Sequence, residues 1–162
     1  MKMTVLGVGD LGATGAPGEG LKTFALGSCV AVVLYDFRLK VAGMAHVALP
    51  ASTTNASRAQ ALPGYFADSG VPALLNAMFS LRGSSDPKGL IAKIVGGASI
   101  MKVQTKFNIG QRNIEAVRKE LMRKRLSPMA EDVGGVISRT VAIDVNTGMV
   151  LINSPGRGEW TL

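Results

Sequence analysis

The clearest pattern in the chain is a pair of apolar runs, residues 30–35 and 41–49, separated by the polar residues 36–40. The first run is β-branched or otherwise apolar throughout, as a buried strand requires, and the second reads as its partner. The polar break between them suits a tight turn. We therefore expect a β-hairpin with its turn centred near Arg38 and Leu39.

Two later stretches have the apolar spacing of amphipathic helices. The first covers residues 69–82 and begins after a cap at Asp68 or Ser69. The second covers residues 109–126 and begins after a cap at Asn108. In this second helix the residues expected to face the core are Ile114, Val117 and Leu121. Its opposite face is basic and is expected to lie in solvent.

Short apolar runs at several other places predict further strands. They cover residues 3–8, 90–95, 129–133, 136–145 and 149–153. Residues 10–20, which are rich in glycine, and residues 51–61, which are small and polar, are expected to be loops. Strands then outnumber helices by about three to one, which predicts an α/β (α+β) fold, a single layered domain over residues 1–162.

Composition narrows the class of protein. The chain is 47% hydrophobic, with a mean hydropathy of +0.27, as a well-packed globular protein is. Its apolar runs are shorter than the roughly 18 residues of a membrane span, and the N-terminus lacks the apolar core of a signal peptide, so we expect a cytoplasmic protein. The net charge of +7 suggests an acidic partner. Nucleic acid is not expected, because only 5% of residues are aromatic and no nucleic-acid motif is present.

Residues 7–12, GVGDLG, match the glycine pattern of dinucleotide-binding loops. That pattern works only where a helix follows, because the helix N-terminus faces the pyrophosphate. The next residues, ATGAPGEG, oppose a helix, and no acidic residue lies where a ribose partner is expected. We therefore expect no nucleotide site here.

The chain has one cysteine, Cys29, and one histidine, His46, which excludes an internal disulfide and makes a zinc site improbable. With the hairpin turn near Arg38, His46 lies opposite Ala31. The side chains of Cys29 and His46 then lie on the same face of the hairpin as diagonal neighbours. A register shift of one residue would separate them. An imidazole beside a thiol can take its proton and activate it as a nucleophile. Residue type alone favours two buried core residues instead, and both readings stay open.

Three pieces of this stretch form a recognisable pattern: Thr23, Leu26-Gly27-Ser28-Cys29-Val30 and Ala45-His46-Val47-Ala48-Leu49-Pro50. They resemble the CheD family of bacterial chemotaxis proteins, which are chemoreceptor glutamine deamidases. The resemblance continues through Asp68, Gly96-Gly97-Ala98, residues 108–113 (NIGQRN) and residues 131–135 (EDVGG). It implies a layered α-β sandwich with mixed sheets, similar to cysteine hydrolases and to the catalytic domain of a toxin deamidase.

The resemblance also implies roles for three residues. Cys29 would attack the side-chain amide of a receptor glutamine, His46 would act as general base, and Thr23 would orient the imidazole or the substrate. Water would then hydrolyse the thioester to glutamate. This mechanism requires no metal and no organic cofactor.

Backbone groups near the cysteine are further candidates. The N–H groups around Gly27, Ser28 and Cys29 are candidates for an oxyanion hole. The resemblance places Gly96 and Gly97 near the active site as well. A glycine pair can turn its N–H groups toward a ligand, although a plain tight turn is commoner.

The family relationship implies partners too. These are the cytoplasmic helical region of methyl-accepting chemotaxis receptors and, in many bacteria, CheC, a phosphatase of the response regulator CheY. A methylesterase side activity on receptors is also implied. Two other classes of function remain open: a non-catalytic regulatory module that binds CheC or receptors, and a redox-sensing thiol protein.

Overall fold

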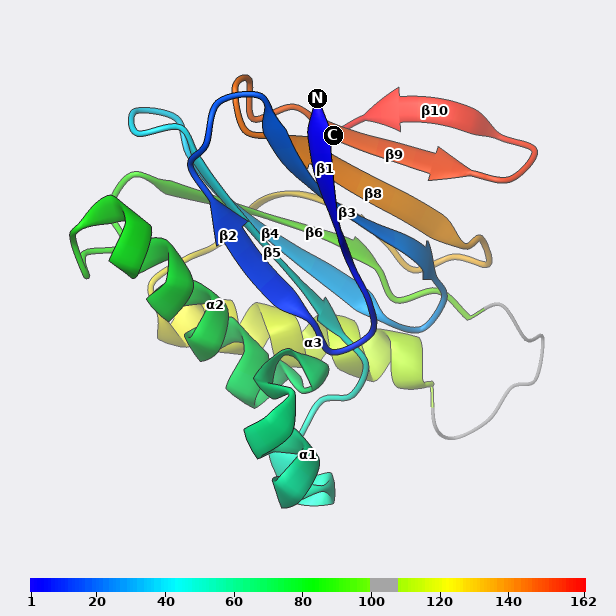
Figure 1. The fold of residues 1–162 in the computed structure, drawn as a ribbon. Coiled ribbons are helices and arrows are strands. Elements are labelled where there is room, and N and C mark those ends of the chain that lie inside the picture. Colours follow the sequence, from blue (N-terminus) through cyan, green and yellow to red (C-terminus); the bar gives the residue numbers. More distant parts are fainter. Residues whose placement is uncertain (100–107) are drawn as a thin grey trace.

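A computed structural model describes residues 1–99 and 108–162, and in this part of the chain it has two five-stranded sheets and three α-helices (Figure 1). In spatial order, the first sheet consists of β1 (Lys2–Leu6), β3 (Glu19–Leu26), β8 (Arg139–Asp144), β9 (Val150–Ser154) and β10 (Gly158–Thr161). The second consists of β2 (Leu11–Thr14), β5 (Val41–Val47), β4 (Val30–Asp36), β6 (Leu90–Gly96) and β7 (Pro128–Val133). The helices are α1 (Ala56–Ala61), α2 (Ala67–Arg82) and α3 (Ile109–Arg123), with 3-10 turns η1 (Ser52–Thr54) and η2 (Pro63–Tyr65).

The elements form three layers. Helices α2 and α3 cover one face of the second sheet, and the first sheet covers its other face (Figure 1). Val32 and Leu34 of β4 pack with the helices, while Ala31 and Val33 pack with the first sheet. Both sheets are mixed, because β1 pairs parallel with β3 and β6 pairs parallel with β7. The predicted layered α/β fold with mixed sheets is confirmed.

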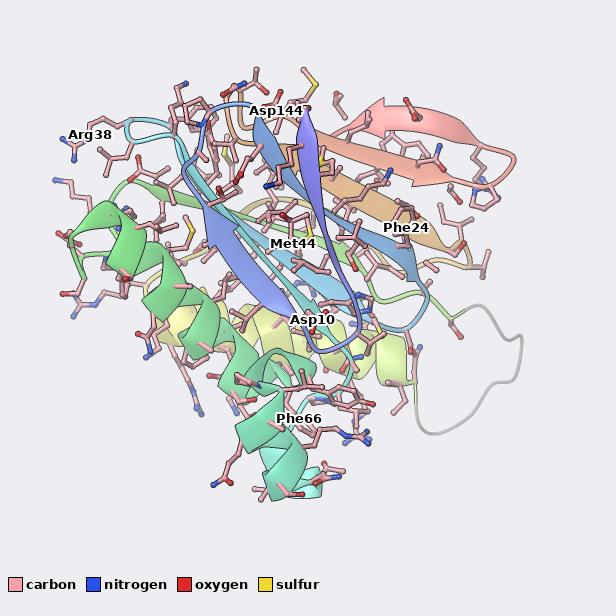
Figure 2. All side chains as sticks on the ribbon, viewed as in Figure 1. Asp10, Phe24, Arg38, Met44, Phe66 and Asp144 are labelled. Carbon is pink, nitrogen blue, oxygen red and sulfur yellow. The ribbon has the colours of Figure 1, made fainter. Side chains whose placement is uncertain are left out.

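The predicted hairpin is present in the predicted register. β4 and β5 are antiparallel, residues 37–40 form the turn, and Ala31 pairs with His46. Every residue of both strands is buried, because both faces of the hairpin are covered by other layers. Arg38 lies at the turn, and Asp10, whose carbonyl accepts from His46 N, lies beside the other end of the hairpin (Figure 2). We call these the turn end and the open end.

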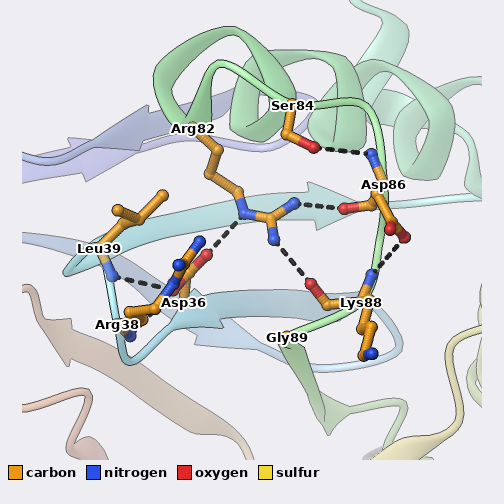
Figure 3. A pocket seen from close by; sticks show the side chains of 8 residues that line it. All are labelled: Asp36, Arg38, Leu39, Arg82, Ser84, Asp86, Lys88 and Gly89. Carbon is orange, nitrogen blue, oxygen red and sulfur yellow. Dashed lines mark hydrogen bonds and ion pairs between the residues drawn. The ribbon is translucent and has the colours of Figure 1, made fainter.

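A buried ion pair stabilises the turn end (Figure 3). The Arg82 Nε donates to Asp36 at 2.6 Å, and the two side chains are only 5% and 3% exposed. The same guanidinium donates to the carbonyls of Asp86 and Lys88, at 2.6 and 2.8 Å, and so attaches the loop after α2. A surface pocket of about 390 Å³ is lined by these residues together with Arg38, Leu39, Ser84 and Gly89.

The prediction of a loop over residues 10–20 was wrong. Leu11–Thr14 forms β2, the edge strand of the second sheet, which pairs antiparallel with β5, and β3 begins at Glu19. Small residues such as Gly12 and Ala13 have weak strand propensity, and the pairing with β5 overrides it. Much of the segment is therefore part of the two sheets.

The predicted caps of α2 were also wrong. The helix begins at Ala67, before both candidate residues, and Phe66 occupies the capping position without a side-chain bond. The Asp68 carboxylate accepts hydrogen bonds from the N–H and hydroxyl of Ser52, and Ser69 donates to the Pro63 carbonyl. These two side chains therefore hold the segment before the helix in place instead of capping it.

Other boundaries differ less. Residues 51–61 hold η1 and α1 where a loop was predicted, because Asn55 caps α1 by accepting from Arg58 N. Asn108 caps α3 as predicted, but the helix ends at Arg123. β10 follows the predicted C-terminal hairpin of β8 and β9 and was missed. The described residues hold ten strands, more than predicted.

Candidate active site

The three candidate side chains come from both sheets and lie toward the space between them. His46 lies in β5 on the same face as Met44, and Cys29, which immediately precedes β4, packs against the same intersheet core. Thr23 lies in β3 of the first sheet. Thr23 and His46 are buried, whereas Cys29 is half-buried. The predicted shared face of Cys29 and His46 is confirmed.

The hydrogen bonds of Thr23 fix the tautomer of His46. The Thr23 hydroxyl donates to the Leu6 carbonyl at 2.7 Å, so its single proton is used there. The same oxygen lies 2.6 Å from His46 Nδ1. Nδ1 must therefore carry the hydrogen and donate to Thr23, which leaves the lone pair on Nε2.

That second ring nitrogen is a buried acceptor without a partner. His46 Nε2 has no hydrogen bond in the part of the chain that the structure describes, and this includes the Cys29 thiol. Buried polar atoms are rarely left in this state, and an exception is often functional. Contacts between a base and its nucleophile are frequently loose before substrate binds. The ring is therefore set to accept a proton from a group that approaches Nε2.

The surroundings keep both groups neutral at rest. Burial raises the pKa of the Cys29 thiol above its ordinary range. Burial lowers the pKa of His46, and the nearby Asp10 carboxylate opposes this effect only in part. A thiolate–imidazolium pair is thus not preformed, and proton transfer has to accompany the attack on a substrate.

The turn of residues 27–29, which carries the cysteine, is held in place by hydrogen bonds to the carbonyls of all three residues. The Gly27 carbonyl accepts from Ala98 N at 2.8 Å, and the Cys29 carbonyl accepts from Gly97 N at 2.8 Å. The Ser28 carbonyl accepts from the Asn113 side chain at 2.9 Å. The peptide units before and after Ser28 are therefore fixed in orientation.

Gly96 and Gly97 lie beside the cysteine and support its turn. The N–H group of Gly97 is not available to a ligand. That N–H is already used by the Cys29 carbonyl. Gly96 has a φ of 114°, and a Cβ there would collide with the same carbonyl. The glycines are needed because β6 ends in direct backbone contact with the turn.

Two contributors were missed from the sequence. Leu6 supplies only a backbone carbonyl, which carries no sequence signal. Asn113 did carry a sequence signal, because it is a polar residue that directly precedes Ile114 of the apolar stripe. In the structure it is fully buried. A polar residue at a core position usually has a specific bonding partner.

Two general properties complete the description. Within the described residues, no three histidine, cysteine, aspartate or glutamate side chains are grouped in a way that could hold a metal ion. Among the described helices, none is long and apolar enough to cross a membrane.

The fold and these side chains define a class: an α/β sandwich with a thiol, an imidazole and a hydroxyl on the facing surfaces of its two sheets. The family model described as CheD chemotactic sensory transduction matches residues 48–154. The chain belongs to this CheD family. The matched span begins after His46 and therefore does not include the three candidate residues.

Those relatives cover nearly the whole chain. A protein of Syntrophotalea carbinolica named probable chemoreceptor glutamine deamidase CheD is 49% identical over 162 residues, all of both chains. Probable chemoreceptor glutamine deamidase CheD 2 of Anaeromyxobacter dehalogenans is 41% identical over 95% of this chain and 96% of its own. Among solved structures, the hypothetical protein YfiH of Bacillus licheniformis covers 76% of this chain and 49% of its own, with a TM-score of 0.48 and 16% identity.

Proposed function

We propose that this protein is a chemoreceptor glutamine deamidase, which hydrolyses glutamine side chains of methyl-accepting chemotaxis receptors to glutamate. Membership of the CheD family and the names of the relatives supply the substrate class. The observation that carries the chemistry is the tautomer of His46: Thr23 holds the hydrogen on Nδ1, and the free Nε2 lies on the face that also bears Cys29.

The first half of the reaction forms a thioester. The Cys29 thiol gives its proton to His46 Nε2 while the sulfur bonds to the amide carbon of the glutamine. The carbonyl oxygen becomes an oxyanion. The imidazolium then gives its proton to the amide nitrogen, the carbon–nitrogen bond breaks and ammonia leaves.

The second half restores the enzyme. A water molecule gives a proton to Nε2 as its oxygen attacks the thioester carbon. The carbon–sulfur bond breaks, the sulfur takes the proton back from the imidazolium, and a glutamate side chain is released. Throughout, the bond from Nδ1 to Thr23 keeps the ring in one orientation and stabilises its charged form.

The N–H groups of Ser28 and Cys29 are the best candidates for the oxyanion hole. In a trans peptide unit the C=O and the following N–H point in opposite directions. The Gly27 and Ser28 carbonyls are held by Ala98 and Asn113. The N–H groups of the same two peptide units therefore point away from those partners, and Ser28 is exposed. This choice keeps Ser28 and Cys29 from the three sequence candidates and leaves out Gly27.

The redox-sensing alternative is disfavoured. A sensor thiol needs good exposure and a lowered pKa. Cys29 is half-buried, and its burial raises the pKa. A regulatory module that only binds would not need an unpaired Nε2 on the face that also bears the thiol.

The proposal extends to the setting of the reaction. We expect residues 1–162 to act as one cytoplasmic domain on the helical cytoplasmic region of receptors, with CheC as a further partner. Methylester hydrolysis on receptors would use the same thiol and base with methanol as the leaving group.

The direct test uses a purified receptor cytoplasmic fragment. Ammonia release and the mass increase of glutamine deamidation are measured with the wild type and with Cys29→Ala. We expect both signals with the wild type and neither with the variant. Receptor binding by both proteins without any mass increase would overturn the enzymatic proposal in favour of a regulatory module.

A further inference from the structure

Asn113 connects the helical layer to the open end of the hairpin. It lies in the second turn of α3 and is fully buried. Its amide nitrogen donates two hydrogen bonds, both at 2.9 Å, to the carbonyls of Ser28 and Ala48. One side-chain NH₂ group thus joins two chain segments that are 20 positions apart in the sequence.

Both segments carry a candidate catalytic residue. Ser28 directly precedes Cys29, and Ala48 lies two residues after His46. The ladder between β4 and β5 ends at the pair of Val30 and Val47. Asn113 binds the strands just beyond that last pair, where no further ladder bond between them holds the register.

Close backbone packing brings α3 within reach of these carbonyls. A Cβ at Gly110 would lie 2.6 Å from the Ala98 carbonyl, so only glycine allows this approach. Ala98 in turn donates its N–H to the Gly27 carbonyl. The first turns of α3, the end of β6 and the cysteine turn are therefore in direct contact.

The Asn113 amide is only partly satisfied. Its carbonyl oxygen Oδ1 is buried and has no hydrogen-bond partner within the described residues, and an unpaired buried acceptor destabilises the fold. Its nitrogen offsets this cost by binding two carbonyls that an apolar side chain would leave without this donor. The neighbouring residues on the stripe, Ile114 and Val117, are apolar and buried, so Asn113 is a point on this stripe where the helix is hydrogen-bonded to the two segments.

We propose that Asn113 is a positioning residue, which sets Cys29 relative to His46 and aims the Cys29 N–H at the oxyanion. This inference rests on the proposed function. Asn113 does not touch the substrate, because it is fully buried and comes from the helical side of the second sheet, opposite the face that bears His46. It acts on the reaction through the peptide unit of Ser28 and Cys29.

The test compares Asn113→Leu with Asn108→Ala. Asn108 caps the same helix through Gln111 N and touches neither Ser28 nor Ala48, so its loss weakens α3 without disturbing the site. For Asn113→Leu we expect kcat on the receptor fragment to fall by about 10²-fold with little change in KM, as a misplacement of the reacting groups predicts. Asn108→Ala is expected to stay within about twofold of the wild type for both constants.

A second readout does not depend on deamidation. The rate at which iodoacetamide alkylates Cys29 is followed against pH in the wild type, His46→Asn, Asn113→Leu and Asn108→Ala. If Asn113 sets the position of the thiol relative to the imidazole, the Asn113→Leu profile follows that of His46→Asn, and the Asn108→Ala profile follows the wild type. Should Asn113→Leu fail to fold by circular dichroism, Asn113→Ser takes its place in both measurements.

The outcomes separate the two proposals. A wild type that does not deamidate, with alkylation profiles that still divide as expected, would refute the proposed function and leave the positioning role standing. An active wild type with Asn113→Leu and Asn108→Ala alike in kcat and in alkylation would overturn the positioning role.

Discussion

The two ends of the β4–β5 hairpin both bury polar side chains, but they satisfy them differently. At the turn end, Asp36 accepts from Arg38 N, Leu39 N and Arg82, and two further Arg82 donors bind loop carbonyls (Figure 3). At the open end, His46 Nε2 and Asn113 Oδ1 have no partner within the described residues. The buried carboxylate at the turn end is thus fully hydrogen-bonded, whereas the open end has buried acceptors without a partner.

The difference separates stability from chemistry. Burial alone would raise the pKa of Asp36, but its bonds from Leu39, Arg82 and Arg38 lower the pKa below its ordinary value and keep the carboxylate charged. At the open end, burial lowers the pKa of His46 and keeps the imidazole neutral. A satisfied ion pair fixes the turn, whereas an unpaired neutral base is ready to take a proton.

Removing the base should have the largest effect on activity. In His46→Asn the new amide can still donate to Thr23, but Nε2 is gone. We expect kcat to fall by about 10³-fold, as the loss of a general base does. At this position one unpaired buried acceptor, the new amide oxygen, replaces another, Nε2, so the free energy of unfolding should change by no more than about 2 kcal/mol. Deamidation kinetics and urea unfolding test both statements.

Breaking the ion pair should have the largest effect on stability. Arg82→Met leaves the buried Asp36 carboxylate without its cation, which costs about 3–5 kcal/mol of unfolding free energy. Arg118→Met is the matched control, since the Arg118–Glu131 pair is exposed (41% and 30%) and contributes about 0.2–1 kcal/mol. Urea titrations of the three proteins measure the difference. Equal losses in the two variants would show that burial of the pair is irrelevant.

Thr23 should matter through its hydroxyl. Thr23→Val keeps the shape but removes the acceptor for His46 Nδ1 and the donor to the Leu6 carbonyl. The imidazolium that forms in the reaction then lacks the bond that stabilises its charge, and a loss of about 1–3 kcal/mol in the transition state corresponds to a loss of about 5–150-fold in kcat/KM. Thr23→Ser keeps the hydroxyl and should stay within about threefold. A serine variant as inactive as the valine variant would count against the role of the hydroxyl.

The pH dependence should show the smallest change, and its direction follows from burial. Because the pKa of His46 lies below its ordinary value of 6.5, activity should persist below pH 6.5 and fall only when Nε2 is protonated. The unfolded chain binds this proton more readily, so the contribution of His46 to stability rises with pH up to about 6.5 and is constant above it. Both the fall of activity at low pH and this rise of stability with pH should disappear in His46→Asn. An acid limb of activity above pH 6.5 would contradict the burial of this ring.

The sequence predicted those parts of the molecule that depend on local pattern. The hairpin and its register followed from two apolar runs and a polar break, and the buried stripe of α3 followed from its spacing. β2 was missed, because pairing with β5 decides its structure and its own small residues do not. The caps of α2 failed because Asp68 and Ser69 bond to an earlier segment, which local rules cannot foresee.

Within the candidate site, the sequence supplied the identities of the side chains and the structure supplied their connections. Cys29 and His46 were visible because each is the sole residue of its type. The tautomer of His46 depends on a carbonyl of β1, and the orientation of the cysteine turn depends on Asn113, 85 positions from Ser28. Contacts between residues so far apart in the chain produce no recognisable pattern in a single sequence.

The most direct test of the account measures kcat and unfolding free energy side by side for His46→Asn and Arg82→Met. The account predicts opposite outcomes: His46→Asn folds nearly as stably as the wild type and is almost inactive, while Arg82→Met is strongly destabilised and keeps the activity of its folded fraction. If both variants lost activity and stability in the same proportion, the two ends of the hairpin would serve one purpose, and the separation drawn between them would be wrong.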